Sequence, residues 1–355
     1  MSKDLTERLH IRIPLIQAPM AGVSTPALAA AVSDAGALGS IGLGASSVSA
    51  AQQMIRDTKA LTDKPFNVNV FCHCPAQADA AREQAWLDFL RPFFAEFAAI
   101  PPVGLSEIYT SFIADRQGLD MLLAERPAVV SFHFGVPDKH WVSELNAAGI
   151  MTFASVTSVA DAQLAEQAGV DALVAQGFEA GGHRGIFDPQ QADEQLDTLT
   201  LVRRLAGSAS LPLVAAGGIM SGADIARALQ AGASAVQMGT AFIACPESAA
   251  NQAYRERLLS RPQTQMTAAI SGRPARGIVN RIMTEIDVPA APPLPDYPLT
   301  YDASKALNAV ASAAGSADFA AHWAGSGVAQ GVRPLPAAEL VQQLVREYQA
   351  ALTSV

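Results

Sequence analysis

The chain has 355 residues, of which 50% are hydrophobic, and its formal net charge is -9 at pH 7. Charged residues interrupt every apolar run before about 18 residues, so the sequence predicts no transmembrane helix. The negative charge argues against a nucleic-acid partner, because phosphate contacts need clustered Lys and Arg. The net charge does not exclude a small anionic substrate, since such a ligand responds to local charge rather than to net charge.

The N-terminal stretch "MSKDLTERLH" lacks the apolar run of a signal peptide, which favours a cytoplasmic protein. The chain has three cysteines, Cys72, Cys74 and Cys245, and an odd number in such a protein indicates free thiols. The stretch "CHC" from Cys72 to Cys74 could be half of a metal site. No other Cys or His pair has ligand spacing, so we expect no metal.

Short apolar runs alternate with Ala-rich runs along most of the chain. Eight of the short runs are apolar throughout rather than alternating, which is typical of buried parallel strands. These runs are "PLIQA" from Pro14, "LGSIG" from Leu38, "FNVNVF" from Phe66, "AVVSFHF" from Ala128, "MTFASV" from Met151, "ALVAQG" from Ala172, "PLVAAGG" from Pro212 and "AVQMG" from Ala235.

The helices between these strands have recognisable ends. Thr25 is a suitable N-cap before Pro26, and Gly36 provides a left-handed stop. Ser158 and Ser221 each begin a helix with an aspartate three positions later. Eight such strand–helix units predict an α/β fold, a closed TIM (β/α)8 barrel rather than an open doubly wound sheet.

The segment from about 245 to 335 breaks this rhythm. It holds the proline-rich "VPAAPPLPDYP" and the helix-like "DASKALNAVASAAGSADFAAHW". We therefore expect a small, mostly helical cap, residues 245–335, inserted after strand eight. The barrel would take residues 1–244 and 336–355, with "PAAELVQQLVREYQAAL" as its closing helix. A second insertion, 74–101, follows strand three.

Glycines follow two neighbouring strands at the end of the barrel where active sites form. Gly217 and Gly218 end strand seven, and Gly239 and Thr240 end strand eight. One such pair would only turn the chain, but two pairs beside helix N-termini favour a phosphate site. There is no GxxxxGK[ST] motif for a nucleoside triphosphate. "GALGSIGLG" has the wrong spacing for a dinucleotide-binding turn.

"QGFEAGGHRG" follows strand six and combines three glycines with one histidine. Gly181 and Gly182 would let a flat ligand approach the backbone, and His183 could then reach a bound substrate. Its imidazole could donate a hydrogen bond or carry charge near neutral pH. His133 ends strand four and could reach the same space, although a core histidine is an equal alternative.

The insertions that would cover the barrel mouth carry Tyr109, Tyr297, Tyr301 and Lys305. Tyr301 and Lys305 are four positions apart, so they share one face if the stretch is helical. Ordinary packing within the cap is the alternative. There is no GxSxG elbow, no obvious Ser/His/Asp order and no close carboxylate pair of the glycosidase type along the chain.

Four stretches together resemble the nitronate monooxygenases, formerly called 2-nitropropane dioxygenases, and more narrowly their bacterial class I. They are "QAPMAGVSTPALAAAVSDAGALG", "QGFEAGGHRG", "VAAGGIMSGADIARALQAGASAVQMGTAFIACPES" and "SGRPARGIVNR". The likeness runs from about Pro14 to Ala306. The pairing of "EAGGH" with "AAGGI…GASAVQMGT" is specific, whereas "AGGI" alone occurs in many flavin barrels.

The resemblance implies FMN in a TIM barrel, without metal, that oxidises alkyl nitronates such as propionate 3-nitronate with O2. The products would be carbonyl compounds and nitrite or nitrate, a detoxifying reaction. The family's usual mechanism is one-electron transfer from nitronate to FMN, followed by reaction with oxygen. The redox chemistry is then the cofactor's, and the protein supplies position and electrostatics.

Residue roles follow from the positions that match the family. His183 would be the catalytic residue. The substrate would be bound by His133, Tyr109, Tyr297, Tyr301 and Lys305. The flavin would contact Ala18, Met20, Ala21, Asn69, Gln176 and Gly181, and its phosphate would lie on Gly217, Gly218, Gly239 and Thr240.

Two rival functions stay open. An NAD(P)H:quinone reductase or enoyl-thioester reductase could use the same flavin barrel, but it would need a nicotinamide or acyl-carrier site that the sequence does not indicate. A non-catalytic flavin-binding barrel would leave His183 without a role. We expect a monomer or weak homo-oligomer whose partners are a nitronate and O2, with no nucleic acid and no membrane.

Overall fold

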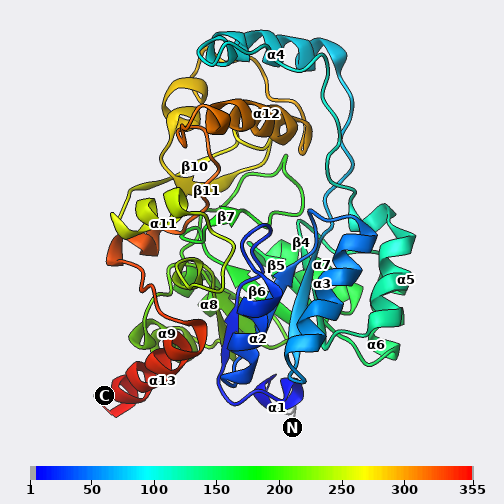
Figure 1. Cartoon of the computed structure of the whole chain (residues 1–355). Helices are drawn as coiled ribbons and strands as arrows, with labels where there is room; N and C mark the ends of the chain where they lie inside the picture. The colour runs from blue at the N-terminus through cyan, green and yellow to red at the C-terminus, as the bar shows by residue number, and fades with distance from the viewer. Residues whose placement is uncertain (1–4, 354–355) are drawn as a thin grey trace.

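A computed structural model describes residues 5–353, and its main sheet has eight parallel strands in the order β1-β9-β8-β6-β5-β4-β3-β2 (Figure 1). A parallel bridge between Ile16 and Leu38 joins the two ends of the sheet, so the strands form a TIM barrel. All eight strands lie where the apolar runs predicted them. They are β1 Leu15–Gln17, β2 Gly39–Gly42, β3 Phe66–Phe71, β4 Val129–His133, β5 Met151–Val156, β6 Ala172–Gln176, β8 Leu213–Ala216 and β9 Ala235–Met238.

Helices surround the barrel as its outer layer (Figure 1). They are α2 Pro26–Asp34, α3 Val48–Leu61, α5 Arg116–Glu125, α6 Lys139–Ala147, α7 Val159–Ala168, α8 Thr198–Ala206, α9 Gly222–Gln230 and α13 Ala337–Thr353. Thr25 caps α2 by accepting a hydrogen bond from the Leu28 amide at 3.0 Å, and Ser221 and Asp224 form a capping box on α9. These are the helix starts that the sequence predicted.

The barrel interior is apolar at its N-terminal end. Leu5 and Leu9 of α1 (Leu5–Leu9) share one apolar cluster with Ile16, Phe153 and Val214, which come from the barrel strands. Figure 1 shows α1 beneath the barrel, at the end opposite to the cap. Because this end is filled by side chains, a ligand has room only at the C-terminal ends of the strands, as in other barrels of this fold.

The cap combines helices with a small sheet that the sequence analysis did not anticipate. A three-stranded antiparallel sheet has the order β10-β11-β7. The elements of this region are β7 Gly182–His183, α11 Gln252–Leu259, β10 Thr264–Thr267, β11 Ala275–Ile278, the π-helix η2 Ile282–Ile286, α12 Leu299–Ala313 and the 3-10 helix η3 Ser326–Gln330. Two short helices, η1 Phe112–Ala114 before α5 and α10 Thr240–Ile243 after β9, place Phe112 and Phe242 in the barrel core instead. In the three-stranded sheet His183 pairs with Ala275.

The earlier insertion also belongs to this region in space. It forms α4, Ala80–Ala95, which lies over α12 at the far end of the molecule (Figure 1). Trp86 and Phe94 of α4 share an apolar cluster with Leu307 of α12 and Phe319. The boundaries 1–244 and 336–355 against 245–335 stay a prediction, and residues 1–4 and 354–355 of the proposed barrel domain lie outside the described residues. Within residues 5–353, no helix has both the length and the apolar character needed to cross a membrane.

Candidate active site

A cavity of about 720 Å³ lies at the C-terminal ends of the barrel strands, between the barrel loops and the cap. This volume is in the range of sites that enclose a cofactor or drug-sized ligand. Every residue that the sequence singled out lines it. These residues are Ala18, Met20, Ala21, Asn69, Tyr109, His133, Gln176, Gly181, His183, Gly217, Gly218, Gly239, Thr240, Tyr297, Tyr301 and Lys305. The structure thus brings the set together, whereas the individual roles stay predictions.

The glycine turn after β8 adopts a backbone that other residues rarely take. Gly217 has φ +122° and Gly218 has φ +70°. A Cβ on Gly217 would lie 2.8 Å from the Thr198 hydroxyl oxygen, so a side chain there would collide. After β9, the Thr240 hydroxyl accepts a hydrogen bond of 2.9 Å from the Gly325 amide, which leaves its proton to donate to a ligand. Bare backbone and a free hydroxyl proton fit a phosphate.

Asn69 and Gln176 differ in how much of their side chains a ligand could use. The Asn69 amide nitrogen donates to the Ser131 carbonyl at 3.0 Å and to the Ser131 hydroxyl at 2.9 Å. No hydrogen bond within residues 5–353 uses the side-chain oxygen Oδ1 of Asn69, which can accept from a flavin edge. Gln176 is occupied at both ends, because Nε2 donates to the His183 carbonyl at 2.9 Å and Oε1 accepts from the Gly185 amide at 2.8 Å. Gln176 therefore holds the histidine loop.

His183 is half-buried on β7 and points into the cavity. Burial, followed by the charges of His133 and Arg273, lowers the pKa of His183 to about 3. The imidazole is therefore uncharged at neutral pH. Of the two roles that the sequence left open, hydrogen bonding fits this environment.

Ser271 is the polar partner of the His183 ring and is fully buried. Its Oγ lies 2.9 Å from His183 Nε2 and 3.1 Å from the Arg273 carbonyl oxygen. If the serine proton goes to Nε2, the imidazole carries its own proton on Nδ1. If the proton goes to the carbonyl, Nδ1 has a lone pair. No hydrogen bond of residues 5–353 uses Nδ1, so this atom is available to a ligand in the cavity.

His133 supports the same loop from the neighbouring strand. Its Nε2 lies 3.1 Å from the His183 carbonyl oxygen, the same oxygen that Gln176 contacts. Burial lowers the pKa of His133 to about 4, so it is also neutral and donates this hydrogen bond. The ring therefore lines the cavity and fixes the backbone of His183 at once.

Aromatic rings and one cation form the roof. The Tyr109 ring lies 5.9 Å from Tyr301 and 6.4 Å from Tyr297, measured between centroids. Lys305 Nζ lies 4.9 Å from the centre of the Tyr109 ring and 5.2 Å from that of Tyr301, as in a cation–π contact. Lys305 is exposed and forms no ion pair with a carboxylate among residues 5–353. Its charge is therefore available at the mouth.

Trp323 is a cavity residue that the sequence analysis missed. Its ring centroid lies 5.1 Å from that of His183, and its Nε1 donates to the Tyr301 hydroxyl at 3.4 Å. The backbone of Trp323 is held by a bridge to Gly277 and by the Tyr254 hydroxyl, which donates to its carbonyl. No motif around "HW" indicates this position, since it depends on the fold of the cap.

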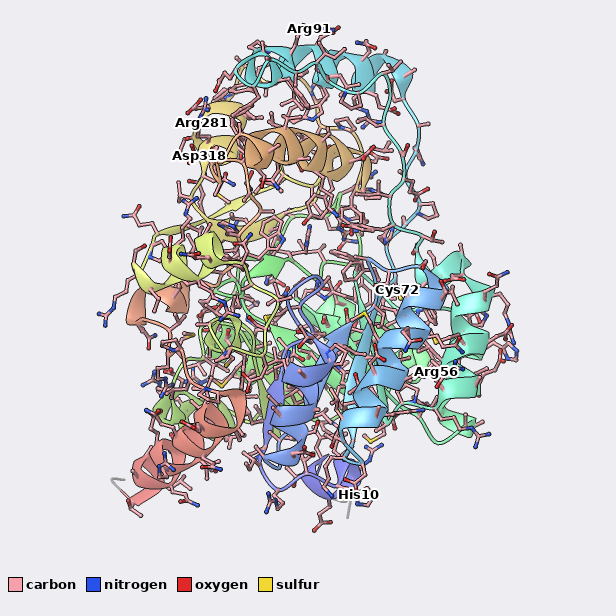
Figure 2. All side chains as sticks on the ribbon, viewed as in Figure 1. His10, Arg56, Cys72, Arg91, Arg281 and Asp318 are labelled. Carbon is pink, nitrogen blue, oxygen red and sulfur yellow. The ribbon has the colours of Figure 1, made fainter. Side chains whose placement is uncertain are left out.

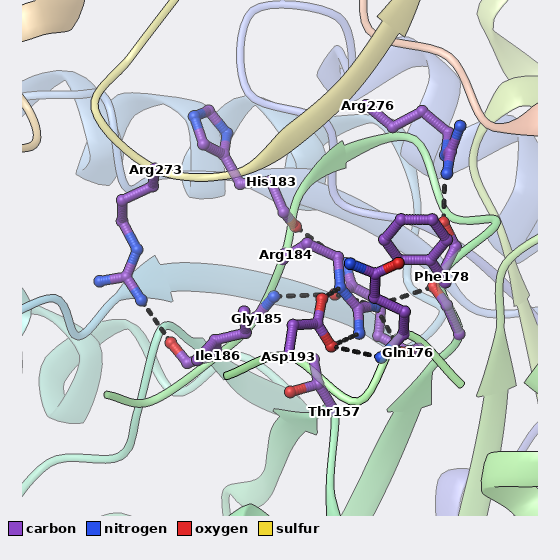
Figure 3. Close-up of polar contacts among 12 residues, drawn as sticks. Thr157, Gln176, Phe178, His183, Arg184, Gly185, Ile186, Asp193, Arg273 and Arg276 are labelled. Atoms are coloured by element: carbon purple, nitrogen blue, oxygen red, sulfur yellow. Dashed lines mark hydrogen bonds and ion pairs between the residues drawn. The ribbon is translucent and has the colours of Figure 1, made fainter. Parts of the chain in front are cut away.

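Arg184 was also missed, although it lies inside the "AGGHRG" stretch. It is 1% exposed and pairs with Asp193 through Nε at 2.8 Å. Its Nη1 donates to the carbonyls of Gln176 at 2.8 Å and Gly177 at 2.9 Å, so it ties the loop to the end of β6 (Figure 3). Figure 3 also shows its neighbour His183 turned the other way. The alternation of a short strand explains this, because successive side chains point to opposite faces.

The "CHC" stretch does not converge on a metal position. Cys72 follows β3 at the end of the barrel that faces the cap and is buried, whereas Cys74 is exposed (Figure 2). His73 lies against aromatic rings, 4.9 Å from Tyr297. Among residues 5–353, no three His, Cys, Asp or Glu side chains gather closely enough to bind a metal ion.

A (β/α)8 barrel with such a cavity at its C-terminal face belongs to the large class of barrel enzymes that bind their ligands there. The model of the family described as nitronate monooxygenase matches residues 2–347. The chain therefore belongs to the nitronate monooxygenase family and is an oxidoreductase. A protein named nitronate monooxygenase from Pseudomonas aeruginosa is 58% identical over 98% of this chain and 99% of its own. One from Paraburkholderia phytofirmans is 56% identical over 99% and 96%.

Solved structures are similar over almost the whole chain. Nitroalkane oxidase from Streptomyces ansochromogenes has a TM-score of 0.88 at 36% identity and covers 99% of both chains. FabK from Thermotoga maritima has a TM-score of 0.75 at 27% identity and covers 99% of this chain and 97% of its own. The likeness includes the cap as well as the barrel, because so little of either chain lies outside the match.

Proposed function

We propose that this protein is an FMN-dependent nitronate monooxygenase that oxidises alkyl nitronates, propionate 3-nitronate included, with O2. The products would be carbonyl compounds and nitrite or nitrate, and the role that of detoxification in the cytoplasm. One observation carries the proposal. A neutral histidine, glycine turns suited to a phosphate and a cationic aromatic roof line one cavity in a chain of this family.

The proposed cofactor fits the residues of the barrel loops. Gly217, Gly218, Gly239 and Thr240 would hold the phosphate of FMN, and the Asn69 carbonyl oxygen would accept from the edge of its ring system. The backbone of Ala18 to Ala21 lies on the same cavity wall. FMN would supply the redox chemistry when bound. FMN is favoured over FAD because the sequence has no second nucleotide-binding segment.

The remaining residues would bind and orient the anion. With the Ser271 proton on Nε2, His183 would offer its Nδ1–H to a nitronate oxygen. Tyr109, Tyr297 and Tyr301 would enclose the alkyl group and exclude water. A nitronate is already an electron-rich carbanion, so the site needs hydrogen-bond donors and positive charge that bind it rather than a strong base.

Anaerobic mixing tests this function against its rivals. Purified protein should be yellow and release FMN on denaturation, and a nitronate should bleach the flavin without oxygen. Bleaching by NADH but not by a nitronate would favour a quinone or enoyl-thioester reductase. Bleaching by neither would favour a non-catalytic flavin barrel, and release of FAD would overturn the cofactor assignment.

A further inference from the structure

Arg273 is a buried cation that forms no ion pair with a carboxylate among residues 5–353. It is 4% exposed and lies just before β11. Its Nη2 donates to the Ile186 carbonyl (Figure 3), while its Nε is buried and has no hydrogen-bond partner in the described part of the chain. Asp188 and Asp161 favour its charge from a distance, and neither forms an ion pair with it. Burial lowers the pKa of Arg273 to about 10, so the guanidinium is charged at neutral pH.

One aromatic ring separates this cation from the cavity. The guanidinium lies 4.4 Å from the centre of the Phe134 ring. The Phe134 ring also contacts three rings that line the cavity. Its centroid lies 5.5 Å from that of His183, 4.6 Å from that of His133 and 5.3 Å from that of Tyr297. Arg273 therefore acts on the ligand space through a ring and does not touch it.

The cavity lacks negative charge, although the chain as a whole is acidic. Among the described residues that line the cavity there is no Asp and no Glu, and Lys305 is the only Lys or Arg. The titratable groups that face His183 are His133 from β4, His73 after β3, the roof tyrosines and Arg273. Burial, and after it the charge of Arg273, also lowers the pKa of His73, to about 4.

We propose that Arg273 is a specificity-determining residue: from behind Phe134 it supplies the permanent positive charge that makes the cavity select anionic over neutral ligands. A buried charge is screened much less by solvent and salt than the exposed Lys305. The same charge disfavours protonation of His183, so that the histidine stays a neutral hydrogen-bonding group beside the anion. The inference rests on the proposed function in naming a nitronate as the physiological anion and in the bound flavin whose absorbance reports binding.

Two variants separate charge from packing. Arg273→Gln removes the charge and keeps a donor for the Ile186 carbonyl, whereas Arg273→Lys keeps the charge. The probes are nitrite, an anion, and nitroethane below pH 7, a neutral nitro compound. Binding is followed in the holoprotein by the flavin absorbance. We expect Arg273→Gln to weaken nitrite binding about tenfold relative to nitroethane, and Arg273→Lys to change this ratio less than about twofold.

A second measurement is independent of ligand and turnover. In an NMR pH titration over the range in which each protein stays folded, the His183 imidazole should begin to protonate at a higher pH in Arg273→Gln than in the wild type, and at the wild-type pH in Arg273→Lys. Arg273→Met is the substitute if the Gln variant does not fold. Equal loss of nitrite and nitroethane binding, or an unmoved His183 titration in the charge-free variant, overturns the proposal. A wild type that binds nitrite but does not oxidise nitronates refutes the proposed function and leaves the role of Arg273 testable.

Discussion

The imidazole of His183 owes its neutral state first to burial and then to residues that lie far away in the sequence. His133 comes from β4 and Arg273 precedes β11, and after burial both oppose protonation and lower the pKa of His183. The glycines before His183 are enough to predict that this histidine lies at the barrel mouth. They do not predict the protonation state of His183, because that state depends on which side chains the fold packs around the imidazole. Trp323 was missed for the same reason.

We expect His183→Asn to retain FMN and the fold but to lose about 10²-fold in kcat/KM on nitronates, roughly 3 kcal/mol of transition-state stabilisation. The substituted amide can still donate a hydrogen bond, but it cannot reproduce the imidazole between Ser271 and the ligand. Steady-state kinetics per bound flavin measure this effect. Loss of flavin with little loss of rate would instead make the histidine a cofactor ligand, and unchanged turnover would make it structural.

Lys305→Met should raise KM for propionate 3-nitronate more than for a plain alkyl nitronate. The exposed ammonium group at the mouth has no acidic partner among residues 5–353, so it can pair with a second negative charge on the substrate. The two KM values are compared in one buffer of low ionic strength, because exposed pairs are screened by salt. Equal changes for both substrates would refute the pairing but not the family.

At the level of elements, the strands of the barrel were predictable and the small sheet of the cap was not. Parallel strands buried on both faces read as continuous apolar runs, and this pattern located all eight of them. β7 has two residues, and its partner β11 lies about 90 positions later, so no local pattern indicates their pairing. The packing of α4 on α12 likewise depends on contacts between distant segments.

The turn after β8 gives a prediction at this scale. Gly218→Asp should abolish FMN retention, because it adds a negative charge where the phosphate is proposed to lie and strains a backbone with φ +70°. Gly169→Asp is the matched control. Gly169 also has positive φ, +89°, but ends α7 away from the cavity, with open space around it. Flavin content by absorbance should fall in the first variant only, and equal contents would contradict the phosphate assignment.

For the whole molecule, the buried histidines couple stability to pH. Burial lowers the pKa of His183 to about 3 and the pKa values of His73, His133 and His322 to about 4, against 6.5 for the free side chain. As pH falls below about 6.5, the unfolded chain takes up these protons before the folded one. The stability is thus complete above pH 6.5 and is lost towards pH 4, at about 1.4 kcal/mol per pH unit for each imidazole.

Urea unfolding between pH 7 and pH 5 measures this loss. His73→Phe should reduce the slope of stability against pH by the contribution of one imidazole, because His73 is fully buried and burial is the main cause of its lowered pKa. His140→Gln is the control, since the His140 side chain is 77% exposed. A flat stability profile in the wild type, or an equal slope in all three proteins, would show that the histidines titrate normally in the folded state.

The pairing of β7 with β11 limits how relatives of this protein can be recombined, in the laboratory or in evolution. Residues 182–183 lie within the barrel part of the sequence, but they pair with a strand of the cap. A chimera that exchanged only 245–335 between relatives would place a foreign β11 against the native histidine strand and a foreign α12 beneath the native α4. Recombination that preserves the geometry of the proposed site therefore has to carry three separate stretches of the gene together: 74–101, the strand with its histidine, and 245–335.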